Sequence, residues 1–213
     1  MKIAIIGATG WIGGTVTHEL LRRGHDVTAV ARDPAKLATK HARLSAVHAD
    51  LKDGASISKA VAGHDAVIAS VASRKDGVAG FQVSTAKLLL AILPRAGVKR
   101  LIWVGGAGSL EVAPGMRLVD SPEFPAQWKQ EALAQADTLE VFRQSNAALD
   151  WTFLSPPAMI GPGLRTGKYR TGENKLLANE KGESTISVDD FAMALVDELE
   201  KPKHIRARFT VAY

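Results

Sequence analysis

Three glycines, Gly7, Gly10 and Gly13, stand at regular intervals after the apolar run 2–6. An apolar, β-branched run that stops at a glycine predicts a strand, and the pattern after it predicts a helix over about 11–23. Gly7 lets the chain turn sharply, Gly10 lets backbone approach a ligand, and Gly13 lets the helix pack close to the strand. Free amides at the start of such a helix attract phosphate. The segment therefore predicts a dinucleotide-binding turn rather than a purely structural one, with ligand contacts from Gly7, Thr9, Gly10, Trp11 and Ile12.

The residue that follows the second predicted strand, 26–31, indicates which dinucleotide is bound. NAD sites usually place an acid there, whereas an arginine neutralises the 2′-phosphate of NADP. Arg32 stands in this place and its forked guanidinium suits a phosphate, with Lys36 close by. Asp33 is an acid one position later, so NAD(H) stays possible, and Arg32 could also be a solvated loop charge. We expect NADP(H) to be preferred over NAD(H).

Small and polar residues end the other predicted strands, at the edge where doubly wound sheets bind their ligands. The end of the third strand is expected beside the adenine, the fourth beside the ribose and pyrophosphate, and the fifth beside the nicotinamide. Asp50 could instead cap the segment that follows it. The agreement among these positions, more than any one of them, supports the assignment. The cofactor residues predicted at these ends are Asp50, Leu51, Ser70, Val71, Ala72, Gly105, Gly106, Ser155, Pro156 and Pro157.

Strand and helix patterns alternate along the whole chain. Strands are predicted at 2–6, 26–31, 45–49, 65–71, 100–104, 151–154 and 206–212, and helices at about 11–23, 34–39, 55–62, 80–96, 127–146 and 187–200. Several strands are nearly continuous apolar runs, which favours parallel strands covered on both faces. The fold class predicted is α/β, a single Rossmann-like domain over 1–213 with a doubly wound parallel sheet. Two long irregular stretches, about 107–126 and 157–186, are expected to build the substrate pocket.

The composition excludes several kinds of site. The 213 residues include no cysteine, which excludes disulfides, thiolate nucleophiles and zinc–sulfur centres. The six histidines are interpreted as surface residues, and none pairs with an acid at metal-ligand spacing, so no metal is expected. The net charge of +5 comes from scattered residues, so no nucleic-acid partner is expected. The chain shows no signal peptide and no apolar run that could span a membrane, which predicts a cytoplasmic protein without membrane attachment.

Four segments carry a resemblance to a known family: Gly7-x-x-Gly10-x-x-Gly13, Ala31-Arg32-Asp33-Pro34, Val104-Gly105-Gly106-Ala107-Gly108-Ser109-Leu110 and Ser155-Pro156-Pro157. Together they resemble the atypical short-chain dehydrogenases. Within that group the chain is most similar to NADH-flavin reductases related to flavin/biliverdin reductase B, and to NmrA-like NAD(P)-binding proteins. The resemblance covers essentially the whole chain. It implies a single Rossmann domain, NADP(H), and hydride transfer to a flavin-like or quinone-like acceptor.

The chain departs from two patterns found among these relatives. Ordinary short-chain dehydrogenases use a tyrosine with a lysine four residues later as acid/base. Here Glu173 stands four residues after Tyr169, and Tyr213 is the last residue. Carbonyl–alcohol chemistry and sugar epimerisation by that route are therefore not expected. Biliverdin-type relatives carry a histidine just after the double proline, where this chain has Ala158 and Met159, so a biliverdin-like substrate is not favoured.

What remains for catalysis is the positioning of an acceptor that already takes a hydride readily. Ser109 could donate a hydrogen bond to this acceptor, or could bind backbone within its own loop. Tyr169 could stack on the acceptor or donate a proton, or could be a structural strand residue. Two functions stay open: an NADP(H)-dependent reductase of a flavin, quinone or similar planar acceptor, and a non-catalytic NAD(P) sensor that acts through a protein partner. Either could be a monomer or a homodimer.

Overall fold

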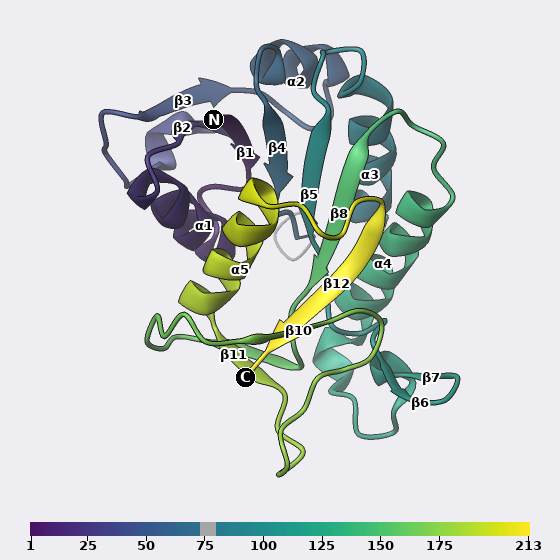
Figure 1. The fold of residues 1–213 in the computed structure, drawn as a ribbon. Coiled ribbons are helices and arrows are strands. Elements are labelled where there is room, and N and C mark those ends of the chain that lie inside the picture. The colour runs from purple at the N-terminus through teal and green to yellow at the C-terminus, as the bar shows by residue number, and fades with distance from the viewer. Residues whose placement is uncertain (73–79) are drawn as a thin grey trace.

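A computed structural model describes residues 1–72 and 80–213. Strands and helices alternate along the chain, as the periodicity predicts, and Figure 1 shows their arrangement. The strands are β1 Lys2–Ile6, β2 Asp26–Ala31, β3 Leu44–His48, β4 Ala66–Ala69, β5 Arg100–Val104, β6 Glu111–Ala113, β7 Met116–Arg117, β8 Asp150–Ser155, β9 Met159–Gly161, β10 Arg170–Gly172, β11 Thr185–Ser187 and β12 Ala207–Ala212. The helices are α1 Trp11–Arg22, α2 Gly54–Val61, α3 Phe81–Ile92, α4 Ala126–Arg143 and α5 Val188–Glu200, with 3-10 turns η1 Pro34–Lys36 and η2 Leu118–Asp120.

In the described part of the chain, the central sheet has eight strands in the order β10-β12-β8-β5-β4-β1-β2-β3. The pairings from β12 to β3 are parallel, and β10 runs antiparallel to β12. The chain first builds outward from β1 to β3 and then returns to place β4 on the other side of β1. Sheets of this kind have their ligand crevice at such a reversal, beyond the carboxyl ends of the two strands.

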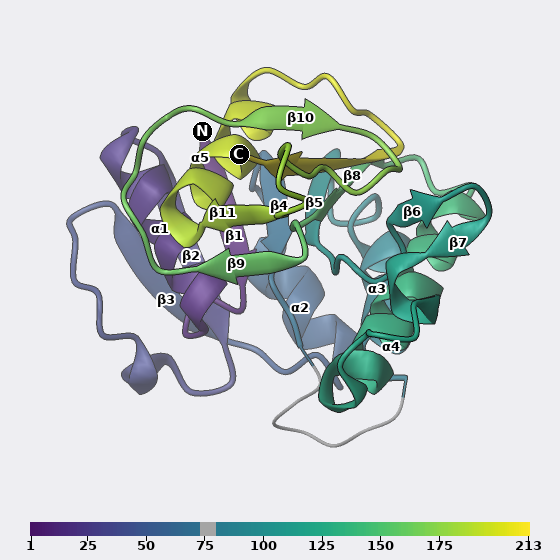
Figure 2. The ribbon, with the colours of Figure 1, turned by 90° about the horizontal axis from the view of Figure 1, so that it is seen from below.

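Helices cover both faces of the sheet. On one face α1 and α5 pack against each other, and α2, α3 and α4 cover the other face (Figures 1 and 2). Neighbouring residues of β1 enter opposite layers, because side chains of a strand alternate. Ile3 and Ile5 join the core beneath α1 and α5, whereas Ala4 and Ile6 join the core beneath the other helices. This double burial explains the nearly continuous apolar runs of the strands.

An aromatic cluster holds the last turn of α4 against β5 and β8. Phe142 on α4 lies with its ring centroid 5.5 Å from that of Trp103 on β5 and 5.9 Å from that of Phe153 on β8. All three side chains are fully buried. Tilted and edge-on ring pairs at these separations are favourable, so the cluster fixes α4 against β5 and β8.

The predicted fold class is confirmed, and the predicted strands and helices match the observed ones to within a few residues. The two stretches predicted as irregular loops are wrong in part. The stretch 107–126 contains the β6–β7 hairpin and η2, and the stretch 157–186 contains β9, β10 and β11. These strands have two or three residues each, too few to show a period of two, and β9 finds its partner β11 across more than twenty residues.

Candidate functional site

The turn after β1 is packed so tightly that two of its glycines are required by the protein itself. Gly7 has a φ of +94°, and a Cβ at this residue would lie 2.0 Å from the carbonyl oxygen of Ser70, at the end of β4. A Cβ at Gly13 would lie 2.1 Å from the carbonyl oxygen of Gly7. The turn therefore sits between β1 and β4, where the order of the sheet reverses.

Gly10 differs from its two neighbours in this motif. It is exposed, and a Cβ there would meet only the carbonyl oxygen of Gly7, at 3.3 Å. Its amide donates to that same oxygen at 3.0 Å. Packing alone explains Gly10 less well than Gly7 and Gly13, as expected where the bare backbone faces a ligand.

Within residues 1–72 and 80–213, the starts of α1, α3 and α4 have no side-chain cap, whereas α2 and α5 have one, and of the uncapped starts α1 is the one that follows the glycine turn. Among the residues that the structure describes, no side chain caps α1 at Gly10, and its first turn holds no acid. In contrast, the carboxylate of Asp53 caps α2, and the hydroxyl of Ser187 caps α5, which also has two acids in its first turn. An uncapped helix start with exposed Thr9 and Gly10 before it, and exposed Trp11 as its first residue, fits an anionic ligand such as a pyrophosphate.

The residue predicted to bind a 2′-phosphate, Arg32, comes directly after β2, and the acid beside it, Asp33, makes contacts within the next turn. Arg32 is exposed directly after β2. The carboxylate of Asp33 caps η1 by accepting from the amide of Ala35 at 3.2 Å, and lies 3.4 Å from the ammonium of Lys36. The acid that could bind a ribose hydroxyl is therefore already engaged within its own turn.

In the sheet, β3 and β4 lie on either side of the pair β1 and β2. Asp50 accepts from the amide of Lys52 at 2.9 Å, so it has the capping role that the sequence left open as an alternative. Leu51 is half-buried against the core beneath α2. Ser70 pairs with β1 through its amide, which donates to Ile6 at 2.9 Å, while Val71 is buried and Ala72 exposed. Ser70 thus contacts the glycine turn directly.

Gly105 and Gly106 follow β5, where a side chain would clash at Gly105 and would fit tightly at Gly106. A Cβ on Gly105 would lie 1.9 Å from the ring of Phe153, and one on Gly106 would lie 3.1 Å from Gln135 of α4. The side chains of Ser155, Pro156 and Pro157 are buried at the end of β8. The hydroxyl of Ser155 has no hydrogen-bond partner among the described residues, and a hydroxyl buried in this way marks a place for water or a ligand group.

Ser109 and Tyr169, the two predicted catalytic residues, lie against opposite faces of the sheet. The hydroxyl of Ser109 accepts from the guanidinium of Arg208 at 3.0 Å, beside α4. The ring of Tyr169 packs against the core beneath α1 and α5, and its hydroxyl donates to Asp197 of α5. The structure therefore does not bring these two side chains to one reacting atom. Their catalytic roles stay predictions.

The environment of Tyr169 works against acid/base chemistry at neutral pH. Burial raises the pKa of its phenol, and the hydrogen bond to the Asp197 carboxylate raises that pKa further. Catalytic tyrosines of the dehydrogenase type need a lowered pKa, which a neighbouring lysine provides. The alternative prediction, that Tyr169 is a strand residue, is wrong by one position, because β10 begins at Arg170.

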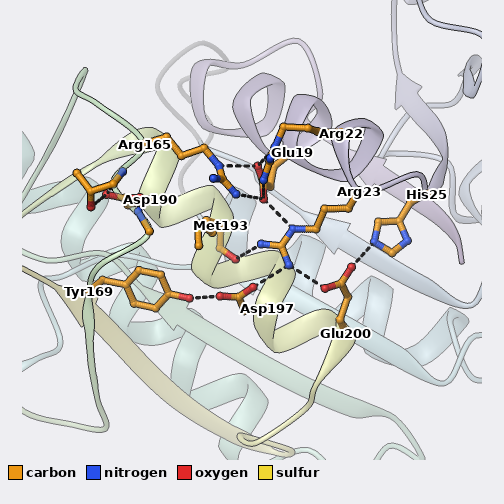
Figure 3. A network of polar contacts seen from close by, with 12 residues as sticks. Glu19, Arg22, Arg23, His25, Arg165, Tyr169, Asp190, Met193, Asp197 and Glu200 are labelled. Carbon is orange, nitrogen blue, oxygen red and sulfur yellow. Dashed lines mark hydrogen bonds and ion pairs between the residues drawn. The ribbon is translucent and has the colours of Figure 1, made fainter.

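A network of carboxylates on α1 and α5 is the feature that the sequence analysis missed (Figure 3). Glu19 is 5% exposed and accepts hydrogen bonds from three arginines, Arg22, Arg23 and Arg165. Arg165 comes from the exposed segment between β9 and β10, so this contact ties that segment to α1. The available signal was a glutamate at an apolar position of an amphipathic helix, between Val16 and Leu20.

The same network corrects the interpretation of one histidine as a surface residue. His25 is 6% exposed, and its Nε2 lies 2.9 Å from a carboxylate oxygen of Glu200 on α5. The position follows the end of α1, where a loop residue is ordinarily exposed. Here α5 packs beside α1 and covers it, a contact between segments 175 positions apart.

Asp190, at the start of α5, holds the other end of the segment between β9 and β10. It is fully buried and accepts from the amide and hydroxyl of Thr166 at 3.1 and 2.6 Å, from the amide of Gly167 at 2.8 Å, and from the hydroxyl of Tyr213 at 2.7 Å. Burial alone would raise the pKa of this carboxyl, but these hydrogen bonds outweigh it and lower the pKa. The residue therefore remains ionised at neutral pH.

Replacing Asp190 with asparagine is expected to lower the free energy of unfolding at pH 7 by about 1–3 kcal/mol, because charge-assisted hydrogen bonds are lost. The folded-state pKa is depressed, so the stabilisation is present above the unfolded value of about 4 and disappears as the pH falls through the folded value. The difference between wild type and variant should therefore shrink only below about pH 4. Urea unfolding across pH 3–8 measures it, with half-exposed Asp189→Asn as the control. An equal loss in both variants would contradict this role.

No helix among the described residues is both long and apolar enough to cross a membrane. Within the same residues, no group of three or more histidine, aspartate or glutamate side chains is placed to hold a metal ion.

Comparison with known proteins gives a family for the chain. Residues 7–202 match the model of a family described as NAD(P)H-binding. A solved structure from Burkholderia pseudomallei, provisionally named an exported protein, is 47% identical with full coverage of both chains and a TM-score of 0.91. A structure from Bacteroides thetaiotaomicron, provisionally named an epimerase, is 38% identical, covers 100% of this chain and 96% of its own, and has a TM-score of 0.92. One from Streptococcus pneumoniae, provisionally named an NADH-flavin reductase, is 37% identical, with coverages of 100% and 99% and a TM-score of 0.88.

Proposed function

Because the chain belongs to the NAD(P)H-binding family, we propose that it is an NADP(H)-dependent reductase that delivers hydride to a flavin, a quinone or a similar planar acceptor. The observation that carries the proposal is the uncapped start of α1 at the reversal point of the sheet, behind a turn that only glycine can form at Gly7 and Gly13. The name of the Streptococcus pneumoniae relative agrees with a reductase.

The proposed cofactor contacts follow the crevice from β2 to β8. The turn from Gly7 to Ile12 would bind the pyrophosphate with its amides, and Arg32 would bind the 2′-phosphate. When bound, NADPH would supply the hydride. The remaining proposed contacts are the strand ends, with Asp50 and Leu51 toward the adenine, Ser70, Val71 and Ala72 toward the ribose and pyrophosphate, and Gly105, Gly106, Ser155, Pro156 and Pro157 toward the nicotinamide.

A planar acceptor is favoured because neither tyrosine of this chain is placed as an acid/base. The hydroxyl of Tyr169 donates to Asp197 and that of Tyr213 donates to Asp190. A quinone or flavin needs no such group, since it accepts a hydride once it is held against the nicotinamide. The reaction balances with one proton from water: quinone, NADPH and a proton give hydroquinone and NADP⁺. Dehydrogenation of alcohols and epimerisation would need the missing pair.

A second function is a non-catalytic sensor that binds a protein partner according to the state of the cofactor. The absence of the tyrosine–lysine pair favours it, because a sensor keeps the cofactor site without the catalytic groups. It predicts tight binding of NADP(H) with no turnover, and a partner whose affinity differs between NADP⁺ and NADPH.

We expect purified protein to oxidise NADPH steadily when a flavin or quinone is supplied, at rates above the uncatalysed reaction. The absorbance of NADPH at saturating cofactor measures it, with a panel of flavins, quinones, aldehydes and ketones. Ketones should give no turnover. If no acceptor reacts while calorimetry still detects NADPH binding, the reductase is excluded and the sensor is retained.

We further propose that the protein acts in the cytoplasm, where NADPH is available, on a small molecule and as a monomer or homodimer. The scattered positive charge supports the absence of a nucleic-acid partner. Size-exclusion chromatography with light scattering determines the assembly.

A further inference from the structure

A shallow depression of about 460 Å³ lies between β9, β11 and the residue that follows β12. It opens at the same end of the sheet as the glycine turn, since β9 follows the carboxyl end of β8 and Tyr213 follows that of β12. Figure 2 looks onto this end of the molecule. The residues that line the depression are Met159, Ile160, Gly161, Pro162, Gly163, Leu164, Thr166, Thr185, Ile186, Ser187 and Tyr213.

Large apolar side chains in this lining are left open to water. Leu164 is 83% exposed, Met159 66% and Tyr213 38%, whereas Ile186 beneath them is 3% exposed. Exposed apolar area costs about 25 cal/mol per Å², so a group of such residues around a concave surface is typical of a binding site.

The chemistry of the lining selects a neutral and flat occupant. The lining residues within the described part of the chain carry no charged side chain. The hydroxyl of Tyr213 is taken by Asp190 and by the amide of Ser187, so Tyr213 offers its ring. A thioether, an aliphatic side chain and an aromatic ring together favour an apolar aromatic ring over a phosphate or carboxylate.

The wall that carries Leu164 is held in place by the carboxylate network (Figure 3). On its carboxyl side, Arg165 donates to Glu19 of α1 at 3.0 Å, and Thr166 and Gly167 donate to Asp190 of α5. The carbonyl oxygen of Leu164 accepts from the hydroxyl of Ser187 at 3.0 Å. A wall that is ordered before binding loses little entropy when a ligand arrives, which favours affinity.

From these observations we infer that the depression, here called the β9–β11 subsite, binds the ring of a neutral quinone with an apolar substituent in preference to a phosphorylated flavin. The inference rests on the proposed reductase function and names its acceptor class. Leu164 and Met159 are the residues that set the preference, and Glu19 and Asp190 position the wall.

Kinetics with a matched pair of acceptors test the subsite. Menadione, which is neutral and apolar, should show a KM at least about tenfold below that of naphthoquinone sulfonate, its anionic counterpart. Leu164→Ser should raise the KM of menadione about 5- to 20-fold, with kcat within about twofold and the KM of NADPH unchanged. Leu164→Met should restore it. Ile205→Ser is the control, since Ile205 is 41% exposed just before β12, at the opposite end of the sheet. Equal KM values for the two acceptors, or an unchanged KM in Leu164→Ser, would overturn the inference.

Binding measured without turnover separates this inference from the proposed function. The chain has four methionines, Met1, Met116, Met159 and Met193, whose methyl groups can be labelled with carbon-13. Titration with menadione should shift the methyl signal of Met159 and leave those of Met1 and Met116 unchanged. A shift of Met159 without any NADPH oxidation would retain the subsite and exclude the reductase. Oxidation of NADPH with an unmoved Met159 signal would retain the reductase and exclude the subsite.

Discussion

Replacing Gly13 with alanine is expected to abolish NADPH binding and to destabilise the protein by about 2–3 kcal/mol. The added Cβ would lie 2.1 Å from the carbonyl oxygen of Gly7, which is backbone and cannot move aside alone. Gly7 in turn is pressed against Ser70 at the end of β4, so the whole turn must shift. Because the amides of this turn are the proposed pyrophosphate site, we expect the dissociation constant of NADPH to rise by at least about 100-fold, equal to about 3 kcal/mol.

Gly14→Ala provides the matched control for this result. A Cβ on Gly14 would lie 3.4 Å from the carbonyl oxygen of Ala8, an ordinary contact. Alanine should even stabilise α1 by about 0.5–1 kcal/mol, because glycine is a poor helix former. Calorimetry and urea unfolding of both variants measure the two effects. Retained NADPH binding in Gly13→Ala would show that the turn is not the phosphate site.

Replacing Arg32 with alanine is expected to weaken NADPH binding about 10- to 150-fold and to leave NADH binding almost unchanged. One charge-assisted contact to the 2′-phosphate would be lost, worth about 1.5–3 kcal/mol. NADH has no such phosphate, so its affinity does not depend on this residue. The ratio of the two dissociation constants, measured by fluorescence titration, is the decisive quantity.

The ratio of the NADPH and NADH dissociation constants should depend separately on the charge and on the shape of the side chain at position 32. Arg32→Lys keeps the charge but loses the forked geometry, so an intermediate ratio is expected. Lys36→Ala should change the ratio less, because its ammonium already lies 3.4 Å from the carboxylate of Asp33. An equal loss of NADPH and NADH affinity in Arg32→Ala would refute the assignment of a 2′-phosphate site and favour NAD(H).

The predicted cofactor crevice is an example of what local sequence can indicate. Gly7 and Gly13 are needed because of atoms within a few residues or in the adjacent strand, and the structure shows the close contacts that their spacing implies. Asp33 shows the limit of what local sequence can indicate. Only the structure reveals that its carboxylate caps η1, because that depends on how the chain turns after β2.

The segment 157–186, which is proposed to bind the acceptor, could not be described from local sequence. The segment 157–186 reads as irregular, but three short strands cross it, and its position depends on carboxylates elsewhere in the chain. Glu19 and Arg165 are 146 positions apart, and no local pattern relates them. Tyr169, a catalytic candidate from its residue type, is instead engaged by Asp197, and its pKa is raised rather than lowered.

The amino-acid sequence by itself determined the alternation of strands and helices, the parallel sheet and the glycine turn, because periodicity and steric limits act over a few neighbouring residues. Only the tertiary structure decided which carboxylates hold the wall of the β9–β11 depression, which face of the sheet receives Ser109 and Tyr169, and which apolar side chains stay exposed. Those outcomes depend on pairings between distant segments, and a buried charge is tolerated only where folding brings its partners to it.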